Sequence, residues 1–137
     1  MDFIPIFDIP QFVEYIKIKN YTIQTRHDID DWMSPDYISE IQNIYKNNID
    51  KYDKFLIQAQ PIRFNYQDKT KQKMTKYHDR NNSMFLTLCQ KEYSNHILEE
   101  KHRHMWRKIS KVFTIPENYV EWVIHGNNIS CNRKNFR

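Results

Sequence analysis

Apolar residues recur every three or four positions between Ile38 and Ala59, and this periodicity constrains the fold more than any other feature of the sequence. Such spacing places the apolar side chains on one face of an α-helix. Positions 34–36 (SPD) supply a helix start, with an N-cap hydroxyl, a proline in the first turn and an acid where the helix dipole favours one. Because Pro61 ends the pattern, the sequence predicts one long helix over about 35–60.

Three further helices are predicted from the same kind of evidence. Asp8 and Pro10 precede a helix over about 10–19, and its buried stripe contains Phe12, Val13 and Ile16. A second long helical segment runs from Ser83 to about Phe113, with a break near residue 100. A capping box at 114–117 (TIPE) begins a last helix over about 115–125, which stops at Gly126, the only glycine of the chain.

The remaining segments predict little regular structure. Residues 20–33 read as a polar connector, and residues 62–67 (IRFNYQ) alternate in polarity, which predicts a short strand or an extended arm. The predicted fold class is therefore mainly α. It comprises a single helical domain over 1–126, with one short extended segment, and an extended basic tail over 127–137.

Length and cysteine content place limits on the class of protein. A chain of 137 residues has the size of one domain, and no apolar run approaches the roughly 20 residues of a membrane span. No basic segment precedes the first apolar run, so no secretory leader is expected. Cys89 and Cys131 lie far apart and form no disulfide framework. We therefore expect a cytoplasmic protein with no membrane partner.

Charge is divided unevenly along the chain. Residues 1–60 hold ten acids and six Lys or Arg, a net charge of −4, whereas residues 61–137 hold seven acids and fifteen Lys or Arg, a net charge of +8. Nucleic acid is the usual partner of such a basic half. An ordinary solvated Lys-rich surface is the alternative.

Candidates for metal binding and catalysis are few. On a helix, Cys89, His96 and Glu100 would share one stripe, with His102 and His104 close behind. Zinc sites normally use paired ligands at short spacing, which this cluster lacks, so no metal or cofactor is expected. No Gly-rich phosphate loop exists, and the acids at 28, 30 and 31 read as a solvated turn. We expect no catalytic residues and no enzymatic activity.

Three basic stretches point instead to phosphate binding: 69–80, 101–111 and the tail. Aromatic and histidine side chains interleave with them, and such rings stack on unpaired bases while Lys and Arg neutralise phosphates. The predicted nucleic-acid-binding residues are Lys101, Arg103, Arg107, Lys108, Lys111, Arg133, Lys134, Phe136 and Arg137.

One resemblance favours DNA as the nucleic acid. Residues 106–126 resemble the two-helix core of helix-turn-helix proteins, which would imply a DNA-binding regulator. However, Thr114 occupies the place where a turn glycine is common, and Glu117 and Glu121 on the reading face would repel phosphates. A helical protein-interaction module is a further alternative, because the acidic first half could hold a protein.

The leading interpretation comes from the overall design. A small Ile-, Lys- and Asn-rich protein with a helical body and a basic tail is similar to the dormancy factors that microsporidia place on idle ribosomes. The segments that carry this resemblance are 101–111 and 127–137. It implies a non-catalytic ribosome hibernation factor that inhibits translation. Its basic region would occupy a tRNA site, in contact with rRNA phosphates and with ribosomal proteins.

Overall fold

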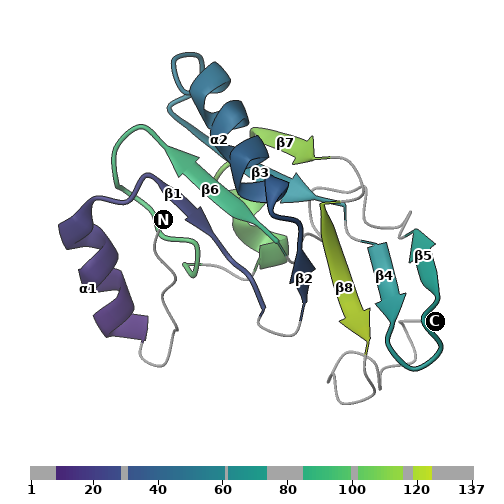
Figure 1. The fold of residues 1–137 in the computed structure, drawn as a ribbon. Coiled ribbons are helices and arrows are strands. Elements are labelled where there is room, and N and C mark those ends of the chain that lie inside the picture. Colours follow the sequence, from purple (N-terminus) through teal and green to yellow (C-terminus); the bar gives the residue numbers. More distant parts are fainter. Residues whose placement is uncertain are drawn as a thin grey trace.

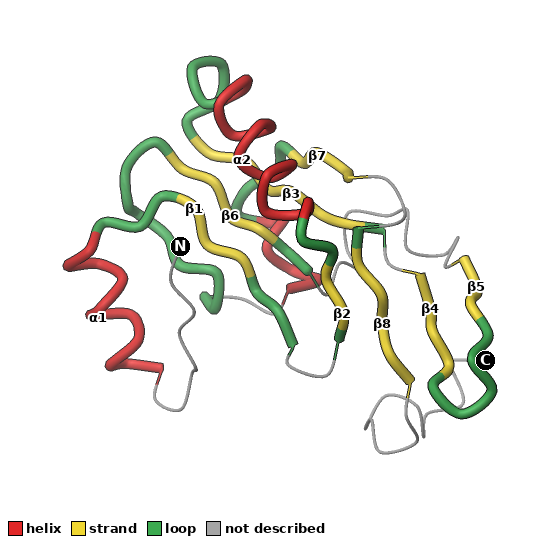
Figure 2. Tube along the Cα trace, viewed as in Figure 1, coloured by secondary structure: helices red, strands yellow, loops and turns green. Residues whose placement is uncertain are grey.

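The computed structural model describes residues 9–28, 31–60, 62–73, 85–99, 102–115 and 119–124. Within these ranges the chain forms eight strands in two four-stranded sheets, together with two α-helices and a 3-10 helix (Figures 1 and 2). The prediction of a mainly α fold is therefore wrong, because the described part of the chain is a mixed α/β structure.

The first sheet has β3 as a central strand. β3 pairs antiparallel with β6 on one side and parallel with β7 on the other, and β1 adds to the free side of β6. Each strand therefore reaches a partner that is distant in sequence. In their order across the sheet, the strands are β1 (Ile23–Thr25), β6 (Thr87–Gln90), β3 (Lys54–Ala59) and β7 (Val112–Ile115).

The second sheet repeats the parallel pairing of the first. β4 pairs parallel with β8 and antiparallel with β5, while β2 pairs antiparallel with β8. The strands, in their order across this sheet, are β2 (Trp32–Met33), β8 (Val120–Ile124), β4 (Ile62–Asn65) and β5 (Lys71–Lys73).

Two chain segments pass from the first sheet to the second in the same direction. One segment contains β3 followed by β4, and the other contains β7 followed by β8. Because the two segments run side by side, β3 pairs parallel with β7 in the first sheet and β4 pairs parallel with β8 in the second. The Gln60 amide extends the first pairing by donating to the Ile115 carbonyl oxygen at 3.2 Å. In the sequence a proline follows each first-sheet segment, at positions 61 and 116. Proline cannot donate to a strand ladder, which explains why both strands end there.

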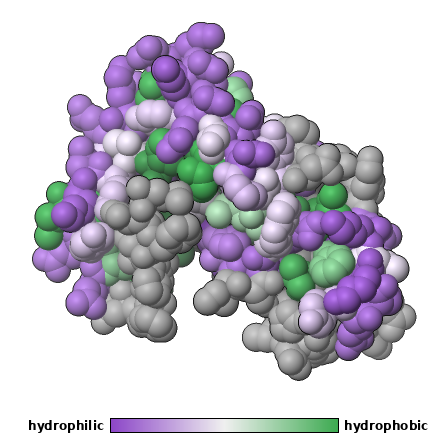
Figure 3. Space-filling model, viewed as in Figure 1, coloured by the Kyte–Doolittle hydropathy of each residue, from purple (hydrophilic) through white to green (hydrophobic). Residues whose placement is uncertain are grey.

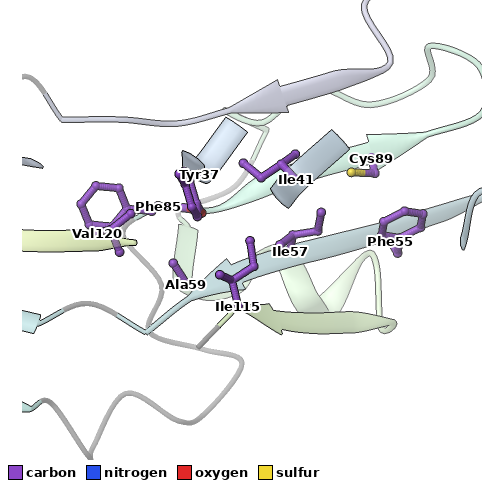
Figure 4. Close-up of a cluster of buried hydrophobic side chains, with 9 residues drawn as sticks. All are labelled: Tyr37, Ile41, Phe55, Ile57, Ala59, Phe85, Cys89, Ile115 and Val120. Carbon is purple, nitrogen blue, oxygen red and sulfur yellow. The ribbon is translucent and has the colours of Figure 1, made fainter. Parts of the chain in front are cut away.

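One face of the first sheet packs against α2 (Asp36–Asn48). Tyr37 and Ile41 of this helix meet Phe55 and Ile57 of β3 and Cys89 of β6 in a cluster of fully buried side chains (Figure 4). The Tyr37 hydroxyl donates to the backbone oxygen of Phe85 at 3.0 Å, which satisfies its polar atom inside the apolar cluster.

The opposite face of the first sheet has a second core cluster. Leu56 and Leu88 pack there against Ile97, Met105 and Ile109, which come from the segment around the 3-10 helix η2 (His102–Arg107). The first sheet is thus the middle of three layers (Figure 1). Burial on both faces explains why residues 55–59 and 85–90 are all buried, a property that no one-sided helix could have.

Two sequence predictions are confirmed closely. The helix predicted over 10–19 is α1 (Ile9–Lys19), in which Phe12 and Ile16 are buried. The extended segment predicted within 62–67 is β4, whose partners β5 and β8 the sequence did not reveal.

The helix predicted over 35–60 is correct only in its first half. It begins one residue later than expected, because Pro35 and not Ser34 is the N-cap residue; the Ser34 hydroxyl accepts a hydrogen bond from the Asp36 amide at 3.2 Å. The helix ends at Asn48, whose side-chain amide donates to the Ile44 carbonyl oxygen, and a turn leads into β3. Residues 54–59 are a strand because burial on two faces and pairing with two strands outweigh local helical spacing.

The predictions of the two later helices are wrong. The segment 83–113 contains β6, a loop, the 3-10 helix and the start of β7, and the segment 115–125 contains β8. The expected N-cap residue Thr114 instead lies in β7, where its hydroxyl accepts a hydrogen bond from the Gln58 side-chain amide at 3.1 Å. The run VEWVI of β8 is rich in β-branched and aromatic residues, which favour a strand. Gly126 and the tail 127–137 lie outside the described residues.

Candidate nucleic-acid interface

Two cations of the predicted basic stretch 101–111, Lys108 and Lys111, contact other side chains of the protein. Arg107 and Lys108 are exposed at the end of η2, and Lys101 and the side chain of Arg103 lie outside the description. The Lys108 ammonium lies 3.2 Å from a carboxylate oxygen of Glu99, an acid just before the stretch. One of the predicted phosphate-binding cations is therefore already paired within the protein.

The Glu99 carboxylate is held by several donors. Burial alone would raise its pKa, but hydrogen bonds from the Asn95 side-chain amide and the His96 backbone amide, together with Lys108, outweigh burial and lower the pKa. The Asn95 side chain also accepts a hydrogen bond from the Lys54 ammonium at 2.7 Å. This network of charges supports the loop after β6.

Lys111 contacts aromatic rings instead of a carboxylate. Its ammonium lies 4.8 Å from the centre of the Tyr52 ring and 4.9 Å from that of Phe113, and the side chain is half-buried. Phe113 in turn contacts Phe55 edge to face, with ring centres 5.2 Å apart. Lys111 therefore covers an aromatic group continuous with the core, and cation–π attraction holds it there.

The other predicted binding residues lie in the tail. Arg133, Lys134, Phe136 and Arg137 belong to the tail, which lies outside the described residues. Their role in binding stays a prediction.

A second concentration of positive charge lies on the hairpin formed by β4 and β5. Residues 62–73 contain four Lys or Arg and one acid. The strand register pairs Phe64 with Lys71, which places both side chains on one face of the second sheet. The Lys71 ammonium lies 5.8 Å from the Phe64 ring centre and 2.7 Å from a carboxylate oxygen of Glu121 on β8.

The loop of this hairpin brings a second ring and a second ammonium to the same place. The Lys69 ammonium lies 3.6 Å from the ring centre of Tyr66 and 5.9 Å from that of Phe64. Over β4 and β5, hydrophobic residues lie at the surface among hydrophilic ones (Figure 3). We call the side chains of Phe64, Tyr66, Lys69 and Lys71 the hairpin surface.

Local hydrogen bonds fix the shape of the loop. The Asn65 amide donates to the Thr70 carbonyl oxygen at 2.9 Å, and the Gln67 amide donates to the Asn65 side-chain oxygen at 3.0 Å. The hydroxyl and the amide of Thr70 both donate to the Asp68 carboxylate, which lowers the pKa of Asp68 and keeps it charged. Between them Lys69 adopts a positive φ of 59°, a conformation that a non-glycine residue keeps only when its surroundings fix it.

Sequence reasoning identified the basic stretch from residue 69 but missed the rings. Phe64 and Tyr66 are not among the predicted binding residues. The available signal was the polarity alternation over 62–67 directly before the lysines, because a short hairpin at that point brings ring and cation onto one face.

The candidate metal cluster loses its geometric basis. Cys89 is on β6 and His96 is in the loop that follows, so the helical stripe that would have joined them does not exist, while Glu100 lies outside the description. Burial raises the pKa of the Cys89 thiol to about 12. The described residues contain no group of three His, Cys, Asp or Glu side chains placed to hold a metal ion.

The helix-turn-helix reading of 106–126 is also wrong, because its described residues form the end of η2 and the strands β7 and β8. The chain matches no known protein family, and comparisons with curated proteins and with solved structures likewise give no match. Neither described α-helix has the length and apolar character that crossing a membrane requires.

Proposed function

We propose that this protein is a non-catalytic RNA-binding factor whose basic second half holds the phosphate backbone. The observation that carries the proposal is the division of charge, −4 in residues 1–60 against +8 in residues 61–137. Lys69, Lys71, Lys91 and Arg107 of the basic half are exposed. Exposed cations attract nucleic-acid phosphates at long range and release condensed counterions when they bind.

A narrower proposal concerns the RNA itself. The helical body that the resemblance to dormancy factors assumed is contradicted by the mixed α/β structure, so the resemblance rests on the basic segments 101–111 and 127–137 alone. With those segments in a site normally used by tRNA, it favours ribosomal RNA in the cytoplasm. Co-sedimentation with purified ribosomes across a salt series tests this directly. Binding to free RNA without binding to ribosomes would contradict the narrower proposal and leave the general one standing.

The general proposal is tested by measuring affinity for single-stranded RNA as a function of salt. The logarithm of the binding constant should fall linearly with the logarithm of salt concentration, with a slope of about 0.7 per phosphate neutralised on a single strand. Arg107→Gln should reduce that slope by about one such step if Arg107 contacts a phosphate. Lys46→Gln removes an exposed charge from α2 in the acidic half and should leave the slope unchanged. Affinity that does not respond to salt would refute the proposal.

A further inference from the structure

The hairpin surface combines aromatic rings with positively charged ammonium groups. Tyr66 is 56% exposed and presents an aromatic face, and Phe64 is half-buried beside it. The Lys69 ammonium lies within 6 Å of both ring centres, and the Lys71 ammonium lies within 6 Å of the Phe64 ring centre. A ligand that fits this surface should carry a flat unsaturated group and a negative charge close to each other.

Nucleotides in a single strand meet both requirements. Each base has a π-face that stacks on an aromatic side chain, and each is joined to a phosphate that a lysine can neutralise. In a duplex the base faces are covered by their neighbours. An acidic peptide would engage the lysines but would leave the Tyr66 ring without a stacking partner. Single-stranded nucleic acid therefore fits the surface better than either alternative.

The structure favours a surface that is arranged before its ligand arrives. Hydrogen bonds around Asn65, Asp68 and Thr70 fix the loop, and the ladder between β4 and β5 fixes Phe64 and Lys71. Only the long exposed side chain of Lys69 needs to move. The ordering cost that a flexible loop would add on binding is therefore small.

We propose that the hairpin surface is a stacking site for unpaired bases of single-stranded RNA. A base stacks on Tyr66 beside Phe64, and the Lys69 ammonium moves from the Tyr66 ring to the adjoining phosphate. Lys71 stays next to Phe64 and contributes a second positive charge, partly offset by Glu121. This inference rests on the proposed RNA-binding function and adds to it a defined site for bases.

The test compares two ligands of equal length, a single-stranded oligouridylate and an abasic strand with the same phosphates, by fluorescence anisotropy. Tyr66→Ser should weaken binding of the oligouridylate by about 5- to 150-fold, which is the usual effect of removing one stacking ring. Binding of the abasic strand should not change. Tyr66→Phe keeps the ring and should bind like the wild type. A single-stranded DNA arm should show the same loss, because stacking does not depend on the sugar.

The matched control is Tyr15→Ser, since Tyr15 is also exposed and has the Lys19 ammonium 6.0 Å from its ring centre. It should leave both affinities unchanged. If Tyr66→Ser has no more effect on the oligouridylate than Tyr15→Ser, the stacking site is refuted and salt-dependent RNA binding stands. A wild-type protein that binds neither strand refutes both proposals. Circular dichroism and thermal melting of Tyr66→Ser should match the wild type because the ring is exposed.

Discussion

Gln90→Leu should destabilise the fold strongly, because one buried side chain organises the loop after β6. The Gln90 side-chain oxygen accepts hydrogen bonds from the Ser94 amide at 3.0 Å, the Ser94 hydroxyl at 3.2 Å and the Asn95 amide at 3.0 Å. Its side-chain amide donates to the Asn95 carbonyl oxygen at 2.8 Å. Gln90 is completely buried, and leucine would replace it with an apolar side chain that can make none of these four bonds.

The expected magnitude follows from the number and kind of bonds. Each contributes about 0.5–1.5 kcal/mol net, so four bonds give about 2–6 kcal/mol. Ser94 is exposed and can regain water on one side, which lowers the expected loss to about 2–4 kcal/mol. The assay is urea denaturation followed by tryptophan fluorescence, which gives the free energy of unfolding for each variant.

Gln72→Leu provides the matched control. Gln72 is exposed on β5, so the same chemical change should alter the free energy of unfolding by no more than about 0.5 kcal/mol. If Gln90→Leu costs no more than Gln72→Leu, the loop does not depend on the Gln90 bonds and the reasoning fails.

Three further outcomes are expected. Phe55→Ala should cost about 3–5 kcal/mol in urea denaturation, because the ring is fully buried in the core; a loss under about 1 kcal/mol would contradict this packing. Cys89, with its thiol pKa raised to about 12 by burial, should resist alkylation at pH 8 in the native protein and react after unfolding, as followed by peptide mass spectrometry; rapid native labelling would contradict its burial. The lowered pKa of Glu99 means that its charge stabilises the fold above the usual glutamate pKa, and this contribution is lost as pH falls through the lowered value. Wild type should therefore exceed Glu99→Gln in stability at pH 7, and the difference should shrink toward pH 3; a pH-independent difference would show that Glu99 does not act through its charge.

The position of the proposed binding surface depends on tertiary structure more than on composition. Basic stretches are visible in the sequence, but composition does not show that Lys108 pairs with Glu99 or that Lys111 covers Tyr52. These contacts depend on a loop and a sheet whose partners come from distant segments. The ring beside Lys69 could have been found locally, because Tyr66 is three residues away and the turn between them is short.

Local sequence predicts the elements whose stability depends on near neighbours. α1 follows from its apolar stripe, the start of α2 follows from positions 34–36, and β4 follows from its alternation. In each case the signal and the element lie within a few residues of each other. Capping, periodicity and alternation are local properties, so they can be read without knowing the fold.

Tertiary contacts make strands of four segments that local sequence did not predict: 54–59, 87–90, 112–115 and 120–124. The spacing of apolar residues in 38–59 suits a helix, yet its second half is a strand between β6 and β7. A short apolar run is ambiguous between a buried helix and a buried strand. Here the parallel pairing of β3 with β7 joins residues more than fifty positions apart and buries residues 55–59 on both faces. Burial and ladder hydrogen bonds of that kind outweigh a local preference of a few tenths of a kcal/mol per residue.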